Sequence, residues 1–359
     1  MSVSQHFAQS YAEARRKFLD AATRASAKLT RYVNPRKGPA GEELTTDVAR
    51  LGPAGASRVL ITISATHGAE GFCGSGIQTA SFESGIAGEL PADTALVAVH
   101  AINPYGFAWT RRVTEENVDL NRNFVDHSKP LPRNAGYDQL ADAICPREWT
   151  EASHIAKQAQ LQAFAQSHGV AALQKAVSGG QYNHPDGVFY GGLAPSWARQ
   201  TLMRIVEDQL AGARHAGLID YHTGLGPFGY GEQIVMHGGA ALKRAEQWFG
   251  TVTNPTLGTS KSAELTGDNL SGLDAVLRPK GIEFTGMALE YGTLSLHEVI
   301  DAVRVDNWLH HHGIVDSKEG RALKATIRDA FYCDKDDWKD MLFEQGMRAQ
   351  RGALKGLAG

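Results

Sequence analysis

Stretches dense in apolar residues alternate along the chain with stretches in which apolar residues recur at helical spacing. Residues 59–65 and 94–102 are almost wholly apolar, which is typical of strands that helices cover on both faces. Further strands are predicted at 44–51, 216–222, 233–237 and 286–292. Helical spacing predicts helices at about 5–28, 74–82, 195–211, 295–311, 318–332 and 336–354. This alternation of strands and helices predicts an α/β fold.

Four stretches do not fit this alternation. Residues 31–41 are rich in Pro and Gly and are interpreted as a linker, and residues 250–281 as mostly loop. Residues 103–124 form a long polar, basic and aromatic loop, and long loops inside compact domains tend to be functional. Residues 126–195 are the least sheet-like and predict an inserted helical and loop region, with a helix at about 150–177. Because none of these stretches is a convincing linker that would split the chain, we expect one domain over residues 1–359.

Composition and charge narrow the function classes. A net charge of -3 gives no basic surface for nucleic acid, and no apolar run reaches the length of a membrane span. The start lacks the apolar core of a secretory signal, and the Arg-rich segment after it carries Glu13 and Asp20, unlike a transit peptide. Cys73, Cys145 and Cys333 are scattered and odd in number, which excludes a disulfide framework and suits a reducing cytoplasm. We therefore expect a cytoplasmic protein.

Two histidines and a glutamate are candidate metal ligands. His67 and Glu70 lie three positions apart on the turn after the 59–65 strand, and His222 ends the 216–222 strand. Ligands of open α/β sheets gather at the carboxyl ends of strands, so these three side chains can meet there. Two His and one Glu with a fourth position open to water form a catalytic zinc arrangement. Taken alone, His222 is better explained as a hydrogen-bonded histidine at a strand end, with Asp220 on the same face of the strand.

A carboxylate and three guanidinium groups complete the candidate chemistry. Glu290 lies within the apolar 286–292 strand. Because burying an ionised carboxylate without a partner is costly, we expect Glu290 either to act as a general base beside a metal or to pair with a structural Arg. Arg111, Arg112 and Arg122 in the long loop suit carboxylates and developing oxyanions, with Asn121 as an added amide donor. A solvated basic surface is the alternative for the two-Arg run.

The order of these motifs resembles the M14 zinc carboxypeptidase superfamily, which includes the succinylglutamate desuccinylase/aspartoacylase branch. The resemblance spans about residues 58–295 and rests on His67-x-x-Glu70, Asn103-Pro-x-Gly106, Arg112, Asp119-x-Asn121-Arg122-Asn-Phe124, Asp220-x-His222 and Glu290. The segments His222-Thr-Gly-Leu-Gly, Gln181-Tyr-x-His-Pro-Asp-Gly-x-Phe-Tyr-Gly-Gly192 and Glu290-Tyr-Gly-Thr293 are most similar to the bacterial DUF2817 group within it.

This resemblance implies a three-layer α/β/α fold around a mixed, mostly parallel sheet, with one zinc ion on His67, Glu70 and His222. It implies Glu290 as the general base, Arg112 as the group that polarises the scissile carbonyl, and Asn121 and Arg122 as the grip on a substrate carboxylate. It also implies that Asp119 hydrogen-bonds His67. The short spacing from Arg112 to Arg122 is closer to the deacylase branch and leaves the choice between Arg111 and Arg112 open.

We therefore expect a zinc hydrolase of an amide bond next to a free carboxylate. The substrate is a peptide C-terminus or an N-acyl amino acid. Tyr230 and Tyr291 are the candidates for a substrate-capping tyrosine, and His184, Asp186 and Tyr190 are candidates to line the substrate pocket, or else belong to a well-capped turn.

Other function classes explain the chain less well. Gly224-Leu-Gly-Pro-Phe-Gly229 matches a dinucleotide-binding pattern, but Pro227 and a following strand take the place of the helix that this pattern must open. No G-x-S-x-G elbow supports a serine hydrolase. The run at 310–312 of three histidines fans around a predicted helix and is interpreted as surface or packing. A non-catalytic binding protein on the same fold is the distant alternative.

Overall fold

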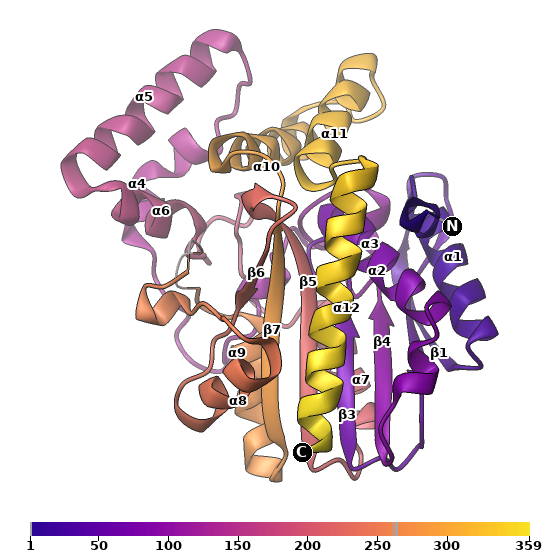
Figure 1. Cartoon of the computed structure of the whole chain (residues 1–359). Coiled ribbons are helices and arrows are strands. Elements are labelled where there is room, and N and C mark those ends of the chain that lie inside the picture. The colour runs from indigo at the N-terminus through magenta and orange to yellow at the C-terminus, as the bar shows by residue number, and fades with distance from the viewer. Residues whose placement is uncertain (1, 261, 263–264) are drawn as a thin grey trace.

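A twisted mixed sheet forms the centre of the molecule (Figure 1). The computed structural model describes residues 2–260, 262 and 265–359. Within these residues the sheet has seven strands in the order β1-β2-β4-β3-β5-β7-β6. The strands are β1 (Lys28–Lys37), β2 (Glu43–Leu51), β3 (Arg58–Ile63), β4 (Thr94–His100), β5 (His215–Phe228), β6 (Gly231–Ile234) and β7 (Glu283–Gly292). The neighbours β4, β3, β5 and β7 are parallel, and β2 and β6 run against them.

Helices cover both faces of this sheet, which confirms the predicted three-layer α/β/α arrangement. On one face α1 (Tyr11–Arg24), α2 (Gly71–Glu83), α8 (Gly239–Phe249) and α12 (Asp336–Ala358) share a core with Leu60, Leu96 and Ile219. On the other face α7 (Trp197–Gln209) and α9 (Asn269–Leu277) pack on the alternate strand residues Val59, Ile61 and Val97. Both sides of each central strand are therefore apolar, since successive side chains point to opposite faces.

A third apolar core lies beyond the carboxyl ends of the parallel strands. It joins the insertion at residues 126–195 to α10 (Leu296–His312) and α11 (Lys318–Phe331). The insertion carries α4 (Ala135–Ile144), α5 (Glu151–His168) and α6 (Val170–Ser178). The short helix α3 (Pro104–Ala108) belongs to the long loop after β4. Short 3-10 turns are η1 (Val3–His6), η2 (Gly68–Glu70), η3 (Ile86–Glu89), η4 (Leu120–Arg122), η5 (Pro255–Leu257) and η6 (Arg278–Lys280).

Several local predictions differ from the structure. The supposed linker at 31–41 belongs largely to β1, an exposed edge strand that pairs antiparallel with β2 and has little apolar alternation to signal it. Residues 250–281, predicted as mostly loop, also contain α9. The single helix predicted at 150–177 is broken into α5 and α6 at Gly169, whose φ of 92° ends a helix. That residues 1–359 form one domain stays a prediction. None of the described helices has the length and apolar character that a membrane crossing requires.

Candidate metal centre and active site

The strand register brings the candidate residues to one edge of the sheet. In the parallel pair of β5 and β7, His222 lies directly beside Glu290. In the pair of β3 and β5, the last residue of β3, Ile63, lies beside Asp220, so the turn that follows β3 continues toward His222. β5 extends to Phe228 rather than ending at His222 as predicted. Residues far apart in the sequence therefore meet because parallel strands present their carboxyl ends on the same side.

The turn that carries His67 and Glu70 is fixed by backbone contacts with the long loop. The Gly68 amide donates to the Arg112 carbonyl at 3.2 Å, and the Ala69 amide donates to the Arg111 carbonyl at 2.8 Å. A Cβ on Gly68 would come within 1.9 Å of the Gly106 carbonyl carbon. Glycine is therefore required at this position, because two backbone segments approach each other directly.

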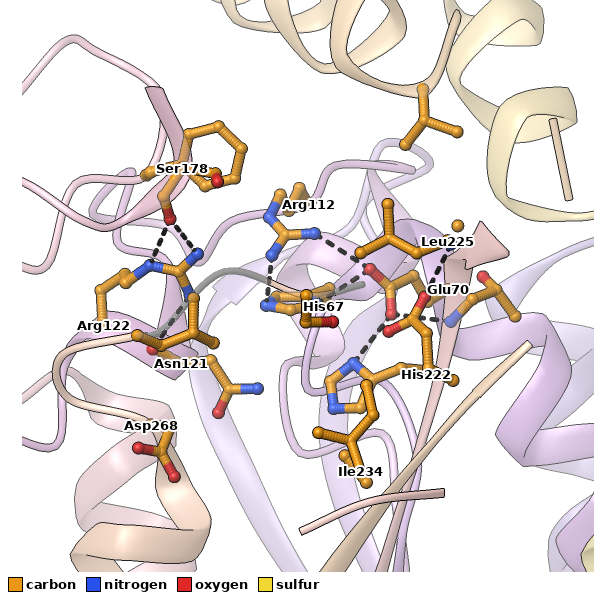
Figure 2. A pocket seen from close by; sticks show the side chains of 18 of the residues that line it. His67, Glu70, Arg112, Asn121, Arg122, Ser178, His222, Leu225, Ile234 and Asp268 are labelled. Carbon is orange, nitrogen blue, oxygen red and sulfur yellow. Dashed lines mark hydrogen bonds and ion pairs between the residues drawn. The ribbon is translucent and has the colours of Figure 1, made fainter. Parts of the chain in front are cut away.

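His67, Glu70 and His222 form a compact group of buried donor atoms, shown at the centre of Figure 2. The Nδ1 atom of His67 lies 2.9 Å from Glu70 Oε1, and the Nδ1 atom of His222 lies 2.9 Å from Glu70 Oε2. One ligand atom from each residue lies within 4.8 Å of the others. Among the described residues, this is the one group of three or more His, Cys, Asp or Glu side chains placed to hold a metal ion.

Each histidine of this group turns its other ring nitrogen to a buried carboxylate. His67 Nε2 lies 3.1 Å from Asp119 Oδ1, and His222 Nε2 lies 2.8 Å from Asp220 Oδ2. At His222, the Asp220 carboxylate on Nε2 favours the proton there and leaves the Nδ1 lone pair for a metal. At His67, Asp119 shares Nε2 with the Arg112 guanidinium, whose Nη2 atom lies 2.9 Å from it. Asp220 is held in turn by the Thr66 hydroxyl at 2.8 Å and the Asn269 amide at 2.8 Å. The donor set thus fits a cation bound through two Nδ1 atoms and one carboxylate.

The charges of the group depend on one another. Burial by itself raises the pKa of the Glu70 carboxyl, but His67 and His222 outweigh it and hold that pKa below its usual range. Burial lowers the pKa of His222, yet Asp220 and Glu70 raise it well above its usual value. Asp119 has its pKa held well below normal against the effect of burial, chiefly by Arg112 and Arg122. Carboxylates and cations here therefore stabilise each other's ionised forms.

Glu290 differs from the other carboxylates of the site. Its side chain lines the cavity, where the Leu225 amide donates to Oε1 at 3.0 Å. Burial, and then the Glu70 carboxylate, raise the pKa of Glu290 to about 7. A carboxyl group with a pKa near neutrality can both accept and donate a proton at physiological pH.

The neighbours Arg111 and Arg112 point to different places. Arg112 donates to Glu70 at 3.1 Å and to Asp119 at 3.0 Å, and it lines the cavity. Arg111 is buried away from the cavity, where it donates to Asp306 of α10 at 3.3 Å and to Asn117 at 3.1 Å. The structure therefore brings Arg112 to the candidate site and gives Arg111 a partner elsewhere.

Arg122 and Asn121 lie on the cavity wall, to one side of His67 in Figure 2. The Arg122 guanidinium is buried and donates to the carbonyl oxygens of Ser178, at 3.2 and 2.5 Å, and of Asn121, at 3.0 Å. The carboxylate of Asp119 comes no nearer to it than 3.8 Å. The Phe189 ring lies 5.3 Å from the Arg112 guanidinium and 5.4 Å from that of Arg122. Arg122 is thus a buried cation whose close partners are neutral carbonyls.

These residues enclose a cavity of about 130 Å³ between the sheet edge, the insertion, α10 and the segment before α9. Six residues predicted to contact the substrate lie outside it. Tyr291 is fully buried in the core and donates to the Leu342 carbonyl at 2.9 Å. His184 lies against Asp138 at 2.9 Å and, with Asp186, lines a separate cavity of about 250 Å³. Arg111 is engaged elsewhere, and Tyr190 and Tyr230 are not among the described residues that line the cavity at the candidate site.

Sequence reasoning missed several residues of the cavity. Phe189, Asp268, Asn269 and four residues of α10 line it. The signal for α9 was present, because Leu270, Leu273 and Leu277 follow Asp268 at helical spacing and the Asp268 side chain caps the helix by accepting from the Ser271 amide at 2.8 Å. Nothing local indicated that α10 would face the site.

Comparison with solved structures identifies the fold. Carboxypeptidase A from Helicoverpa armigera gives a TM-score of 0.51 at 11% identity and covers 98% of this chain and 73% of its own. Bovine thrombin-activatable fibrinolysis inhibitor, solved with tick carboxypeptidase inhibitor, gives 0.48 at 10% identity over 98% of each chain. An aspartoacylase family protein from Mesorhizobium loti gives 0.36 at 17% identity, covering 81% of this chain and 68% of its own. No curated protein matches the sequence.

The first of these similarities, together with the sheet order and the His-Glu-His group, defines an α/β protein of the zinc-carboxypeptidase fold with a candidate metal centre at the sheet edge. The chain belongs to the DUF2817 family, whose description is a protein of unknown function. The family profile matches residues 7–345. The resemblance drawn from the motifs is thereby confirmed for fold and family.

Proposed function

We propose that the protein is a zinc-dependent hydrolase of an amide bond next to a free carboxylate. One observation carries this proposal: two histidine Nδ1 atoms converge on the Glu70 carboxylate, each histidine has a carboxylate on its far nitrogen, and Glu290 lies beside His222 in the strand register. Two nitrogens and one carboxylate with open space in front suit a catalytic zinc ion rather than a structural one.

His67, Glu70 and His222 would hold the zinc. When bound, zinc lowers the pKa of water and polarises a carbonyl oxygen. Glu290 takes a proton from the attacking water and delivers it to the leaving amine, which requires a carboxyl group that titrates near neutrality, as the raised pKa of about 7 allows. Arg112 donates to the carbonyl oxygen as negative charge develops on it.

Arg122 and Asn121 would bind the substrate carboxylate. Arg122 is buried and hydrogen-bonded to neutral carbonyl oxygens, so its charge gains most from an incoming anion. A carboxylate held there places the adjacent amide toward the His67–Glu70 side of the cavity. Arg111 is not part of this proposal, because its guanidinium is engaged with Asp306.

The carboxypeptidase and deacylase reactions use the same groups and differ in what lies beyond the scissile bond. The cavity of about 130 Å³ is smaller than the roughly 300–1,000 Å³ of pockets that take drug-sized ligands. A cavity of this size favours a small substrate, either a dipeptide or an N-acyl amino acid. It therefore supports the deacylase alternative as well as a carboxypeptidase that acts on short peptides.

The test combines metal content with turnover. We expect about one zinc per chain by elemental analysis and hydrolysis of C-terminal dipeptides or N-acyl amino acids. Glu290→Gln should retain zinc and lose about 10²–10⁴-fold in kcat, whereas His67→Ala should lose the zinc as well. A wild-type protein that binds no zinc when supplied with it would overturn the proposal. A protein that binds zinc and ligand but hydrolyses none of these amides would instead be a binding protein on this fold.

A further inference from the structure

The cavity has two unlike walls on opposite sides of the metal centre. One wall is polar, with Arg122, Asn121 and Asp268 together to the left of His67 in Figure 2. Leu225 lies on the other side of His67, above Glu70 in this view. The polar wall suits the carboxylate end of the substrate, so the chemistry of the opposite wall bears on the group beyond the scissile bond.

The opposite wall is apolar and comes from two helices. Leu296, Val299, Ile300 and Val303 line the cavity from α10, and Phe331 lines it from the end of α11. The spacing of three, four and seven residues places the four α10 side chains on one stripe of the helix. A Cβ on Gly224, two residues after His222 on β5, would lie 3.1 Å from Phe331 and 3.5 Å from Val299. The wall therefore reaches the strand that carries His222.

The charged side chains of α10 point away from this wall and are engaged elsewhere. Arg304 is buried and donates to the carbonyls of Ile144 and Ala143, each at 2.8 Å, and to Asp301 at 2.6 Å. Asp306 accepts from Arg111 and from Lys324. None of the charged side chains of α10 lines the cavity within the described part of the chain. These bonds fix α10 to the insertion and to the long loop, so the apolar stripe is held in place before any substrate binds.

We infer that the group on the carbonyl side of the scissile amide is apolar. The inference rests on the proposed function, since it takes the substrate carboxylate to lie at Arg122. It assigns the substrate class as amino acids that carry a hydrocarbon acyl group or an apolar aminoacyl group, and it excludes dicarboxylic acyl groups such as succinyl. A second carboxylate against this wall would lose its hydration without gaining a cation, whereas methylene groups gain by leaving water.

Matched ligands test this selectivity in the zinc-loaded protein. Glycine, alanine, leucine and lysine, each acylated with pentanoyl or with succinyl, give four pairs that differ only at the acyl end. Calorimetric titration of Glu290→Gln measures binding without turnover, and hydrolysis is followed in the wild type. We expect pentanoyl to bind at least tenfold more tightly than succinyl wherever a pair binds, which corresponds to about 1.4 kcal/mol.

A cation placed on the wall should reverse the preference. Leu296 lines the cavity and is 48% exposed, so Leu296→Arg is compatible with folding. It should shift the binding ratio at least tenfold toward succinyl. Ile314→Arg, at a position that is 74% exposed and outside the cavity lining, is the matched control and should leave the ratio unchanged.

The outcomes separate the two proposals. Succinyl ligands that bind as tightly as pentanoyl ligands, or a ratio that Leu296→Arg does not move, would overturn the inference. Hydrolysis of either series would in that case leave the proposed function standing. If the zinc-loaded wild type neither binds nor cleaves any ligand of the eight and also hydrolyses no C-terminal dipeptide, the proposed function fails and the inference fails with it.

Discussion

Replacing Asp220 by asparagine isolates the contribution of the carboxylates behind the metal ligands. Asp220 is fully buried and accepts from Thr66 at 2.8 Å and from Asn269 at 2.8 Å, and its Oδ2 lies 2.8 Å from His222 Nε2. Asp220→Asn keeps the size of the side chain. It removes the charge and leaves one acceptor oxygen to serve three donors.

The size of the effect follows from those contacts. Loss of the charge-assisted bond to His222 costs about 1.5–3 kcal/mol of folding free energy, and an unsatisfied donor adds about 1–3 kcal/mol. Asp220 also raises the pKa of His222, against the effect of burial, so the imidazole becomes a weaker ligand without it. Zinc affinity should therefore fall about 10–100-fold, equivalent to roughly 1.4–2.7 kcal/mol.

Zinc affinity is measured by competition with a chromophoric chelator, and stability by urea unfolding of the metal-free protein. Asp47→Asn is the matched control, because Asp47 is also buried and accepts from Arg15 at 2.6 Å and from Thr45 at 2.8 Å, but it lies on β2 outside the cavity. The control should lose stability and keep its zinc affinity. If Asp220→Asn behaves in the same way, the proposed role of Asp220 in holding a metal ligand is refuted.

Further predictions concern substrate binding, pH and metal. Arg122→Gln should raise KM at least tenfold, because it removes a charge-assisted contact of about 1.5–3 kcal/mol. Arg111→Gln should leave KM unchanged and lower the unfolding free energy by about 2 kcal/mol. If Arg111→Gln raises KM and Arg122→Gln does not, the substrate carboxylate binds at Arg111. Burial lowers the pKa of His100 from 6.5 to about 4, so the unfolded chain takes up a proton first as pH falls. The contribution of His100 to stability should therefore decrease by about 3 kcal/mol between pH 6.5 and 4, and urea unfolding of His100→Phe should lack this contribution. Zinc at 100 times its Kd should add about 2.7 kcal/mol to the wild type, and thermal unfolding of His67→Ala should show no such gain.

Much of the fold was predictable because its signals are local. The runs at 59–65 and 94–102 are apolar on both faces, and each became a central strand, β3 and β4. The errors fell where local patterns are weak. β1 is an exposed edge strand with polar residues, so its pairing with β2 rather than its own composition decides its structure.

The candidate site likewise has features that the sequence could predict and features that it could not. His67, Glu70, His222 and Glu290 could be proposed from the sequence because polar residues at the ends of apolar strands are conspicuous, and parallel strands bring such ends together. The directions in which the side chains point could not be predicted from the sequence. Arg111 and Arg112 are adjacent in a loop without a period, and only the position of Asp306 on α10 shows which guanidinium is engaged away from the cavity.

The sequence by itself therefore determined the α/β class, the central strands and the residues able to hold a metal, since these depend on periodicity and on the chemistry of single side chains. Only the tertiary structure decided what surrounds those residues. The apolar wall of α10, the placement of Tyr291 in the core and the enclosure of the cavity by the insertion depend on contacts between segments far apart in the chain. Such contacts are set by packing, which no local pattern records.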